Sequence, residues 1–329
     1  MSRTARERML VLLSGFVVTQ ALATVARLRI SDLVHERPRT AEELAAATGA
    51  DPDALGRVLR ALASLGVFAH ADGIVHQTDL SELLREEAPG SIHGHAEMFA
   101  TVHYRAWTEA GRSLQTGEPA FEHVFGLQLF DWLAEHPEGS ELFNRSMAAS
   151  ARARQAALLA RDWSDVETIV DVGGGTGTML TSLLAQEPHL RGVVFDLPHL
   201  RDETEATIDA TGVRGRCTFE GGSFFERVPP GADAYVLSQI LHDWDDDDAA
   251  RILEVCAAAA RPESRLVLGE VVLVPGDEPD WGKFLDLHML VLLGGRERSE
   301  DEWRRLLDRG GFTFVASDPG ALLIEAVPR

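Results

Sequence analysis

The pattern of apolar and polar positions changes twice along the chain and predicts three regions. Residues 1–95 carry short helical stripes and one hairpin, residues 96–162 are helical, and residues 163–329 alternate β-rich runs with helices. Such alternation predicts a mostly parallel, doubly wound sheet. We therefore expect an α/β fold in which a winged-helix domain and a helical bridge precede a Rossmann-like sheet. The expected strands lie in "TIVDVGGG", "RGVVFDLP", "CTFEGGSFF", "DAYVLSQIL", "SRLVLGEVVL", "FTFV" and "ALLIEAV".

The first region carries clear start and stop signals between residues 40 and 76. Thr40 and Glu43 form a capping-box signature, and Asp51 precedes Pro52 at the start of a second helix. The following "VFAHADGIVHQT" predicts a hairpin. Helix, turn, helix and hairpin together predict a winged helix, a shape that often reads DNA.

The charge of the chain disfavours binding to DNA. Residues 1–95 contain 10 Lys and Arg against 12 Asp and Glu, and the second helix offers only Arg57 and Arg60 to phosphates or bases. A DNA-binding domain normally has a basic face. The formal net charge of the whole chain is −21, which repels nucleic acids and anionic membranes. We therefore expect the domain to form a homodimer and expect no nucleic-acid or membrane partner; a winged-helix regulator is the alternative from another class.

The first residues of the chain can be interpreted as a signal peptide, as a membrane span or as a buried helix. "SRTARER" followed by the apolar run at residues 9–26 resembles a signal peptide or a marginal membrane span. Five polar or small residues dilute the run, and the pattern continues without a break into "RLRISDLV". We therefore expect one helix that is buried on most sides, at a subunit interface.

The cysteine content points to a reducing compartment. Cys217 and Cys256 stand singly on segments that are expected to be core, and no cysteine and histidine spacing typical of a zinc site is present. Unpaired cysteines fit the cytoplasm best.

The aromatic residues of the bridge have two interpretations that can both hold. They form a helical core, or their inner face lines an apolar substrate pocket. The residues concerned are Phe99, Tyr104, Trp107, Phe121, Phe125, Phe130, Trp132 and Phe143.

The first strand of the sheet ends in a glycine-rich loop, "VDVGGGTGTML". Gly173, Gly175 and Gly177 allow the backbone to approach a ligand closely. A dinucleotide fingerprint needs a further glycine where the chain has Thr178. The spacing behind Asp171 suits S-adenosylmethionine instead, because the ammonium and carboxylate of that cofactor match an acid and bare backbone amides.

Two further strand ends offer groups that suit the same cofactor. Asp196 ends the second strand, 25 residues after Asp171, and its carboxylate can accept both ribose hydroxyls. Ser223 and Phe224 follow the third strand and can contact the edge and the face of an adenine. Three successive strand ends therefore predict S-adenosyl-L-methionine as the cofactor.

The fourth strand ends in "LHDWDDDDAARIL", where His242 is a candidate general base. An imidazole with an unperturbed pKa of about 6.5 can take a proton near neutral pH. Its other ring nitrogen must then be held in the correct tautomer. Glu270, at the end of the next strand, is the first candidate for that contact, and Glu297 in "LGGRERS" is the second.

The aspartates after His242 suggest a metal site, but their spacing favours a helix start. Residues 245–248 are consecutive and precede an apolar helical pattern. Consecutive helix residues point in different directions, and acids at a helix start favourably meet the positive end of its dipole. We therefore expect no metal, and little effect from substitution of Asp246 or Asp247.

With these residues identified, the chain resembles the S-adenosylmethionine-dependent O-methyltransferases of the plant caffeate and isoflavone type and their actinobacterial relatives in aromatic natural-product pathways. The resemblance covers nearly the whole chain. It is carried by "RISDLVHERPRTAEELAAATGADPDALGRVLRALASLGVF", "TGEPAFEHVFGLQLFDWLAEHPE", "DVGGGTG", "DLP", "LHDWDDDDAARIL" and "GGRERSEDEW", in this order.

The resemblance implies methylation of a hydroxyl, typically phenolic, on a small aromatic secondary metabolite, as in antibiotic biosynthesis. It implies that His242 is the catalytic base, with Glu270 and Glu297 beside it. Implied cofactor contacts are Asp171, Gly173, Gly174, Gly175, Gly177, Asp196, Leu197, Gly222, Ser223, Phe224, Ser238 and Trp244. Implied substrate contacts are Phe143, Asn144, Met147 and Asp243.

Two positions depart from the pattern of this family. Many relatives have Asp where this chain has Ser223, and plant members have Lys where it has Ser238. Trp244 has two interpretations, a stack near the cofactor or packing in the core. Some relatives keep the fold and the cofactor but catalyse hydroxylation, decarboxylation or pericyclic reactions, so another reaction on the same fold is the alternative within the family.

Overall fold

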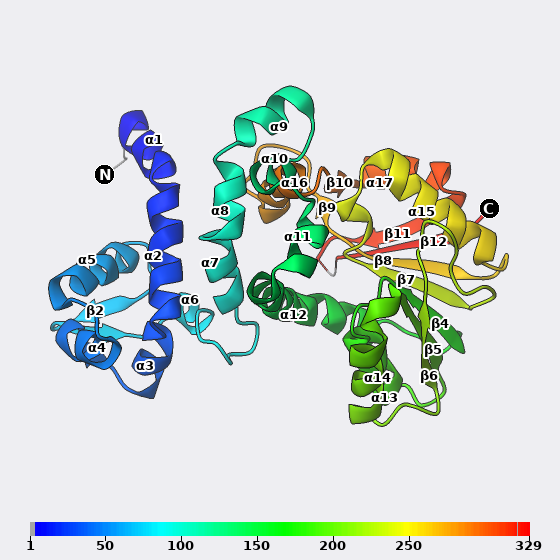
Figure 1. Cartoon of the computed structure of the whole chain (residues 1–329), viewed down its shortest axis with the longest axis horizontal. Helices are drawn as coiled ribbons and strands as arrows, with labels where there is room; N and C mark the ends of the chain where they lie inside the picture. The colour runs from blue at the N-terminus through cyan, green and yellow to red at the C-terminus, as the bar shows by residue number, and fades with distance from the viewer. Residues whose placement is uncertain (1–3, 321) are drawn as a thin grey trace. The chain divides into compact units, whose positions relative to one another are not determined.

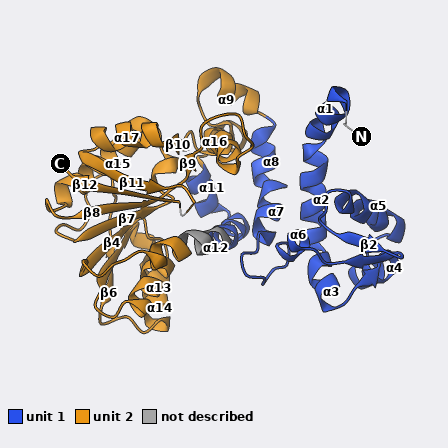
Figure 2. Cartoon of the chain, turned by 180° about the vertical axis from the view of Figure 1, so that it is seen from behind, with its two compact units in different colours: residues 1–108, 129–152 blue, residues 109–128, 153–329 orange. Residues whose placement is uncertain are grey.

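The computed structural model describes residues 4–320 and 322–329, and of residues 148–154 only the backbone. The chain divides into two compact units, which Figure 2 shows in different colours. Unit 1 comprises residues 1–108 and 129–152, and unit 2 comprises residues 109–128 and 153–329. Each unit has a hydrophobic core of its own.

Unit 1 begins with the predicted winged helix. Its strands form a three-stranded antiparallel sheet in the order β1-β3-β2, beside helices α4 and α5 (Figure 1). The elements are α1 (Ala5–Leu13), α2 (Gly15–Arg27), α3 (Ile30–Glu36), β1 (Arg39–Thr40), α4 (Ala41–Thr48), α5 (Pro52–Ala63), β2 (Ala69–Ala71), β3 (Ile74–His76) and α6 (Asp79–Glu82).

The local sequence signals of this region act as expected. The Thr40 hydroxyl accepts the Glu43 N–H while the Glu43 carboxylate accepts the Thr40 N–H, which completes the capping box. The Asp51 side chain caps α5. The apolar stripe of α5 is buried in the core of unit 1, against residues of α2, α3 and α4.

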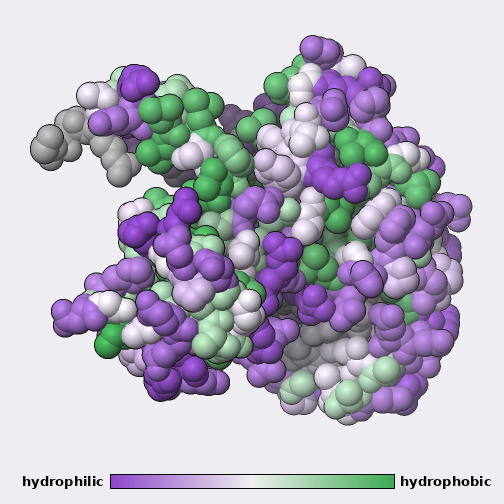
Figure 3. Space-filling view, turned by 60° about the vertical axis from the view of Figure 1, so that its left-hand side comes forward, coloured by the Kyte–Doolittle hydropathy of each residue, from purple (hydrophilic) through white to green (hydrophobic). Residues whose placement is uncertain are grey.

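The expectation of one buried N-terminal helix is wrong within the single chain. Helices α1 and α2 are separated at Ser14 and bent by 46°, and α1 has no buried residue. The polar Ser14 turns its hydroxyl back onto Val11 O instead of continuing the helix. No single helix among the described residues is long and apolar enough to span a membrane, whereas the bent pair α1–α2 passes that test together. The exposed apolar side chains include Met9, Leu10, Leu12, Leu13, Phe16 and Val17. Figure 3 shows apolar surface, in green, gathered at the upper left of the molecule.

The remaining helices of unit 1 come from the region expected to be the bridge. They are α7 (His93–Phe99), α8 (Val102–Trp107), α11 (Leu129–Glu135) and α12 (Pro137–Ala160), whose last residues belong to unit 2. Helices α2 and α7 lie side by side, and Gln20 donates a hydrogen bond to Ala100 O at 2.9 Å.

Unit 2 is built on a seven-stranded sheet in the order β11-β12-β8-β7-β4-β5-β6 (Figure 1). The five strands from β8 to β6 are parallel, and β12 runs against both of its neighbours. The seven expected runs match these strands: β4 (Thr168–Val172), β5 (Arg191–Asp196), β6 (Cys217–Gly221), β7 (Ala234–Ser238), β8 (Arg265–Gly269), β11 (Phe312–Asp318) and β12 (Leu323–Pro328).

The strand order reverses beside β4, since β5 and β6 follow on one side and β7 and β8 on the other. In open sheets of this kind, ligands bind outside the carboxyl ends of the strands at this switch point.

A separate parallel pair joins β9 (Val272–Leu273) to β10 (Arg298–Ser299). The helices of unit 2 are α9 (Ala110–Thr116), α10 (Ala120–Phe125), α13 (Thr178–Gln186), α14 (Arg201–Ala210), α15 (Asp246–Ala259), α16 (Trp281–Leu292) and α17 (Glu300–Arg309), with 3-10 turns η1 (Pro198–Leu200) and η2 (Leu241–Asp243).

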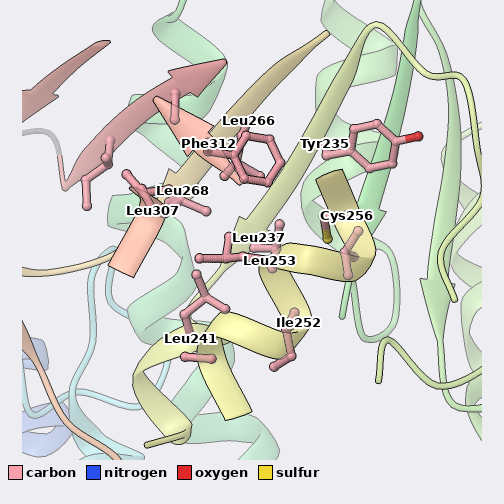
Figure 4. Packing of buried hydrophobic residues seen from close by; sticks show 14 of the residues in the cluster. Tyr235, Leu237, Leu241, Ile252, Leu253, Cys256, Leu266, Leu268, Leu307 and Phe312 are labelled. Carbon is pink, nitrogen blue, oxygen red and sulfur yellow. The ribbon is translucent and has the colours of Figure 1, made fainter. Parts of the chain in front are cut away.

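The two faces of the sheet carry two cores because successive strand side chains point to opposite faces. On β7, Tyr235 and Leu237 join the core under α15 and α17, whereas Ala234 and Val236 join the core under α13 and α14. Figure 4 shows the first core, in which side chains of β7 and β8 meet those of α15 and α17. The sheet is therefore covered on both sides, as the doubly wound pattern predicts.

We predict that Leu253→Ala lowers the free energy of unfolding by about 2–5 kcal/mol, because Leu253 is fully buried in this core and its removal leaves a cavity. Denaturant unfolding followed by circular dichroism measures the effect. Val315→Ala on β11 is the control, since Val315 is 56% exposed and its truncation should change stability by less than about 0.5 kcal/mol. Equal losses in the two variants would contradict the assignment of the core.

Candidate active site

The glycine loop between β4 and α13 has a conformation that suits only glycine at several positions. Gly173, Gly175 and Gly177 have positive φ values of 72°, 57° and 75°. At Gly174, a Cβ atom would lie 2.6 Å from Asp171 Oδ2, so the loop lies directly on the side chain of that acid. Four of the five glycines expected to contact a cofactor therefore form one loop at the carboxyl end of β4.

The acids of the first two strands lie next to this loop. Asp171 is buried, and its Oδ2 has no hydrogen-bond partner among the described residues. Burial raises the pKa of Asp171 to about 7, and the negative charge of Asp196 acts in the same direction. Asp196 Oδ2 accepts the Gly175 N–H at 2.8 Å, and its Oδ1 accepts the Leu197 N–H at 2.6 Å. The loop and both acids thus form one connected group.

The residues expected near an adenine lie at the end of the neighbouring strand. Gly222 N–H donates to Asp196 O at 3.0 Å, and Ser223 Oγ accepts the Phe225 N–H at 3.3 Å. The Trp244 ring meets the Phe225 ring edge-on at 4.7 Å and the Phe224 ring at 6.0 Å. This packing against the core favours a structural role for Trp244. Ser238 ends β7 against Gly269.

His242 lies on the 3-10 turn η2, just beyond the end of β7, and is 7% exposed. Its Nδ1 lies 2.7 Å from Oε1 of Glu297, which is 1% exposed. Its Nε2 lies 3.4 Å from Asp243 Oδ1. One ring nitrogen is therefore fixed by a buried carboxylate, which is the arrangement that a base with a defined tautomer needs.

Glu270 holds the same turn by its backbone. It directly follows β8 and is fully buried, and its Oε1 accepts the N–H groups of Ile240 and Leu241, each at 2.9 Å. The sequence made Glu270 the first candidate for the ring contact and Glu297 the second. The structure gives that contact to Glu297, whereas Glu270 fixes the turn.

One imidazole faces three acids in this site. Burial lowers the pKa of His242, but the charges of Asp243 and Glu270 and the hydrogen bond to Glu297 outweigh it and raise the value to about 10. Burial raises the pKa of Glu270 to about 7 and that of Asp243 to about 6. These surroundings favour the imidazolium form of His242 in the ligand-free chain.

The sequence did not identify Arg298 as part of this site. Its side chain is fully buried and donates to Leu241 O and Trp244 O, each at 3.0 Å, and to Asp246 Oδ1 at 2.9 Å. The only signal in the sequence was its place next to Glu297, in a loop with a second arginine. Since Asp246 pairs with a buried cation, we now expect its substitution to have an effect, whereas the sequence suggested little.

The other aspartates of the acidic run begin α15. The Asp245 side chain accepts the N–H groups of Asp247 and Asp248 and caps the helix. Asp247 pairs with exposed Arg309. A different set has the spacing for a metal ion, namely His242, Glu270 and Glu297, with candidate ligand atoms within 4.8 Å of one another.

The residues expected to contact the substrate are divided between the units. Asp243 lies beside His242 in unit 2. Phe143, Asn144 and Met147 lie on α12 in unit 1, where the Phe143 ring meets the Phe130 ring edge-on at 6.1 Å. Phe143 and Met147 are half-buried and Asn144 is exposed. Their contact with a substrate stays a prediction.

Comparison with protein families gives two matches that together span most of the chain. Residues 107–313 match the O-methyltransferase domain, and residues 10–87 match the O-methyltransferase dimerisation domain. Among curated proteins, the phenazine O-methyltransferase PhzM of Lysobacter antibioticus is 42% identical over 97% of this chain and 95% of its own length.

Solved structures agree with these matches. The crystal structure of LaPhzM has a TM-score of 0.87 and 41% sequence identity, and the alignment covers 99% of this chain and 100% of that one. The O-methyltransferase NcsB1 from neocarzinostatin biosynthesis, in complex with S-adenosylmethionine and 2-hydroxy-5-methyl naphthoic acid, has a TM-score of 0.80 and 32% identity over 95% of this chain and 96% of that one.

We predict that NMR of protein labelled at histidine will show His242 doubly protonated at neutral pH, with its signal assigned by His242→Gln. An unperturbed histidine titrates near about pH 6.5, whereas the pKa of His242 is raised to about 10. Glu297→Gln removes one negative charge but keeps an acceptor for Nδ1, so the His242 titration should move to lower pH. A His242 signal that titrates near about pH 6.5 in the unchanged protein would contradict this account.

Proposed function

The chain belongs to the S-adenosylmethionine-dependent O-methyltransferases, and from this premise we propose that it methylates a phenolic hydroxyl of a small aromatic secondary metabolite. The observation that carries the proposal is the buried His242–Glu297 pair at the end of β7. It lies at the same sheet edge as the glycine loop and Asp196, next to the switch point. The relatives named for phenazine O-methylation and for a complex with a hydroxylated naphthoic acid support an aromatic acceptor.

The residues at the strand ends fit S-adenosylmethionine. Asp171 has a buried carboxylate oxygen without a partner among the described residues, which suits a cationic ammonium group. The Gly174 backbone leaves no room for a side chain. Asp196 still has lone pairs for ribose hydroxyls, because each of its oxygens accepts one backbone N–H. When bound, the cofactor supplies a methyl group that its sulfonium activates.

The chain's own residues then remove the proton from the acceptor oxygen. A phenol has a pKa of about 10 and is mostly neutral near pH 7. His242 in its neutral form takes the phenolic proton at Nε2 while Glu297 holds Nδ1. The imidazolium that results is stabilised by Glu297, Glu270 and Asp243. This arrangement makes His242 a stronger base than an unperturbed imidazole, which favours removal of a phenolic proton.

The high pKa of His242 also sets a requirement on the reaction. An imidazolium has no lone pair for a proton, so His242 must be deprotonated before each turnover. A positive charge on the bound cofactor would make His242 release its proton more readily. Because kcat/KM reports the free enzyme, it should rise with pH through the neutral range.

The proposal includes no metal. His242 Nδ1 bonds to Glu297 Oε1 and Glu270 Oε1 accepts two backbone N–H groups, so hydrogen bonds hold the cluster together without an ion, although Oε2 of each glutamate has no partner among the described residues. The aspartates at 245–248 cap α15 or pair with arginines instead of converging.

We further propose that the enzyme works as a homodimer in the cytoplasm, without nucleic-acid or membrane partners. The match to a dimerisation domain and the exposed apolar side chains of α1 and α2 support the dimer. Two free, buried cysteines support a reducing compartment. The net charge of −21 disfavours anionic partners.

The function is tested with purified enzyme, S-adenosylmethionine and a panel of hydroxylated phenazines, naphthoic acids and benzoic acids. Mass spectrometry should show a product that has gained one CH₂, together with S-adenosylhomocysteine, and activity should survive EDTA. His242→Ala should lower kcat by about 10²–10⁴-fold at neutral pH, because general-base catalysis is lost. Full activity of this variant would overturn the assignment of the base, and a product without the CH₂ gain would favour the alternative reaction on the same fold.

Binding of the cofactor gives an independent prediction. Gly174→Ala should weaken S-adenosylmethionine affinity at least about tenfold, because the new Cβ lies 2.6 Å from Asp171 Oδ2 and must displace the loop or the acid. Gly215→Ala is the matched control, since its Cβ meets no atom within 4 Å. Isothermal titration calorimetry measures both variants. Unchanged affinity in Gly174→Ala would rule out the loop as part of the cofactor site.

A further inference from the structure

We propose that Arg298 and Asp246 form a positioning pair that holds the His242 turn in register with Glu297. The inference rests on the proposed function, because it assigns these two residues a role in aligning the proposed base. It starts from the buried guanidinium of Arg298, which bonds both ends of the turn.

The turn that carries His242 cannot hold its own shape. η2 is a single 3-10 turn of three residues, and such short pieces have weak internal hydrogen bonds. Gln239, which leads into it, has a positive φ of 57°, a conformation that costs energy for a residue with a side chain. The conformation of the turn must therefore be imposed by its surroundings.

Two sets of side-chain and backbone groups impose it from opposite sides. Glu270 binds the N–H groups at the start of the turn. The segment 296–298 binds its carbonyl oxygens: Arg296 N–H donates to His242 O at 2.8 Å, and the Arg298 guanidinium donates to Leu241 O and Trp244 O. The planar guanidinium fork can reach two acceptors at once, which a lysine ammonium does not do with the same geometry.

The neighbouring loop is built for this close approach. A Cβ atom on Gly295 would collide with His242 O and with the backbone of Asp243. The loop therefore lies directly on the turn, and only a glycine fits there. Since Glu297 stands between Arg296 and Arg298, the same contacts that hold the turn also fix the position of its carboxylate relative to His242 Nδ1.

Asp246 is the counter-ion that compensates the positive charge of the buried Arg298 guanidinium. Its Oδ1 lies 2.9 Å from the guanidinium, and its Oδ2 lies 3.2 Å from Arg296 Nη1. A buried cation without a counter-ion is strongly destabilising. Arg298 also stacks over the Trp303 ring at 5.2 Å, which fixes its plane. Loss of the Asp246 charge should therefore move the guanidinium, and with it the turn and Glu297.

The test compares two neighbouring acids of the same helix start. Asp246→Asn removes the counter-ion of Arg298, whereas Asp247→Asn removes an exposed acid that pairs with exposed Arg309 and serves as the matched control. We expect Asp246→Asn to lower kcat on the order of 10–100-fold with little change in the KM for S-adenosylmethionine, because misplacement of a reacting group acts on the chemical step. Asp247→Asn should behave as the unchanged enzyme does.

A spectroscopic readout separates positioning from a general loss of stability. The Nδ1 proton of His242, in its 2.7 Å bond to Glu297, should give a downfield NMR signal. The signal should weaken or shift upfield in Asp246→Asn, at a temperature where circular dichroism shows the variant folded, and stay in place in Asp247→Asn. This readout does not depend on activity, so the positioning role can be judged even if His242 proves not to be the base.

Arg298→Lys provides a second variant if Asp246→Asn does not fold. It keeps the positive charge beside Asp246 but loses the fork that bonds Leu241 O and Trp244 O, so we expect the same fall in kcat and the same change in the His242 signal. An unchanged kcat and an unchanged His242 signal in either folded variant would overturn the proposal.

Discussion

The hydrogen bond between His242 Nδ1 and Glu297 Oε1 joins two segments that lie 55 residues apart in the chain, and most of the site's structure serves to maintain it. Both side chains are buried, so neither can exchange its partner for water without cost. The turn on one side is held through its N–H groups by Glu270 and through its carbonyl groups by Arg296 and Arg298. A short turn beyond a strand end thereby acquires a rigid position.

The same contacts explain the unusual electrostatics of the site. Three acids surround one imidazole, and their combined charge raises the pKa of His242 to about 10 although burial opposes it. At the neighbouring strand ends, Asp171 is buried without a hydrogen-bond partner for Oδ2 among the described residues, and its pKa is raised to about 7. Neither Asp171 nor Asp196 is paired with a cationic side chain among the described residues, which suits a cofactor that carries positive charge.

Much of this arrangement could be predicted from the sequence, because it depends on local signals. Caps such as Thr40, Asp51 and Asp245 mark helix starts by hydrogen bonds within a few residues. β-rich runs that alternate with helices located the strands of the large sheet, and the glycine pattern located the loop at the end of β4. Strand ends of a parallel sheet meet at one edge, which is why the acids and His242 were assigned together.

The remaining features depend on contacts between distant segments. From the sequence, an arginine in a charged, glycine-containing loop is expected to be exposed to solvent. Only the fold shows that Arg298 is buried against the turn η2, which lies more than fifty residues earlier in the chain. The choice between Glu270 and Glu297 for the ring contact was likewise decided by the path of the 294–298 loop. The break at Ser14 was hidden by apolar residues on both sides of it.

The most direct test of the account is a crystal structure of the enzyme with S-adenosylhomocysteine and its aromatic acceptor. The account predicts that the acceptor hydroxyl lies about 2.6–3.2 Å from His242 Nε2, while Nδ1 keeps its bond to Glu297. An acceptor hydroxyl that faces solvent or another side chain, with Nε2 turned away from it, would contradict the role of His242 as the base.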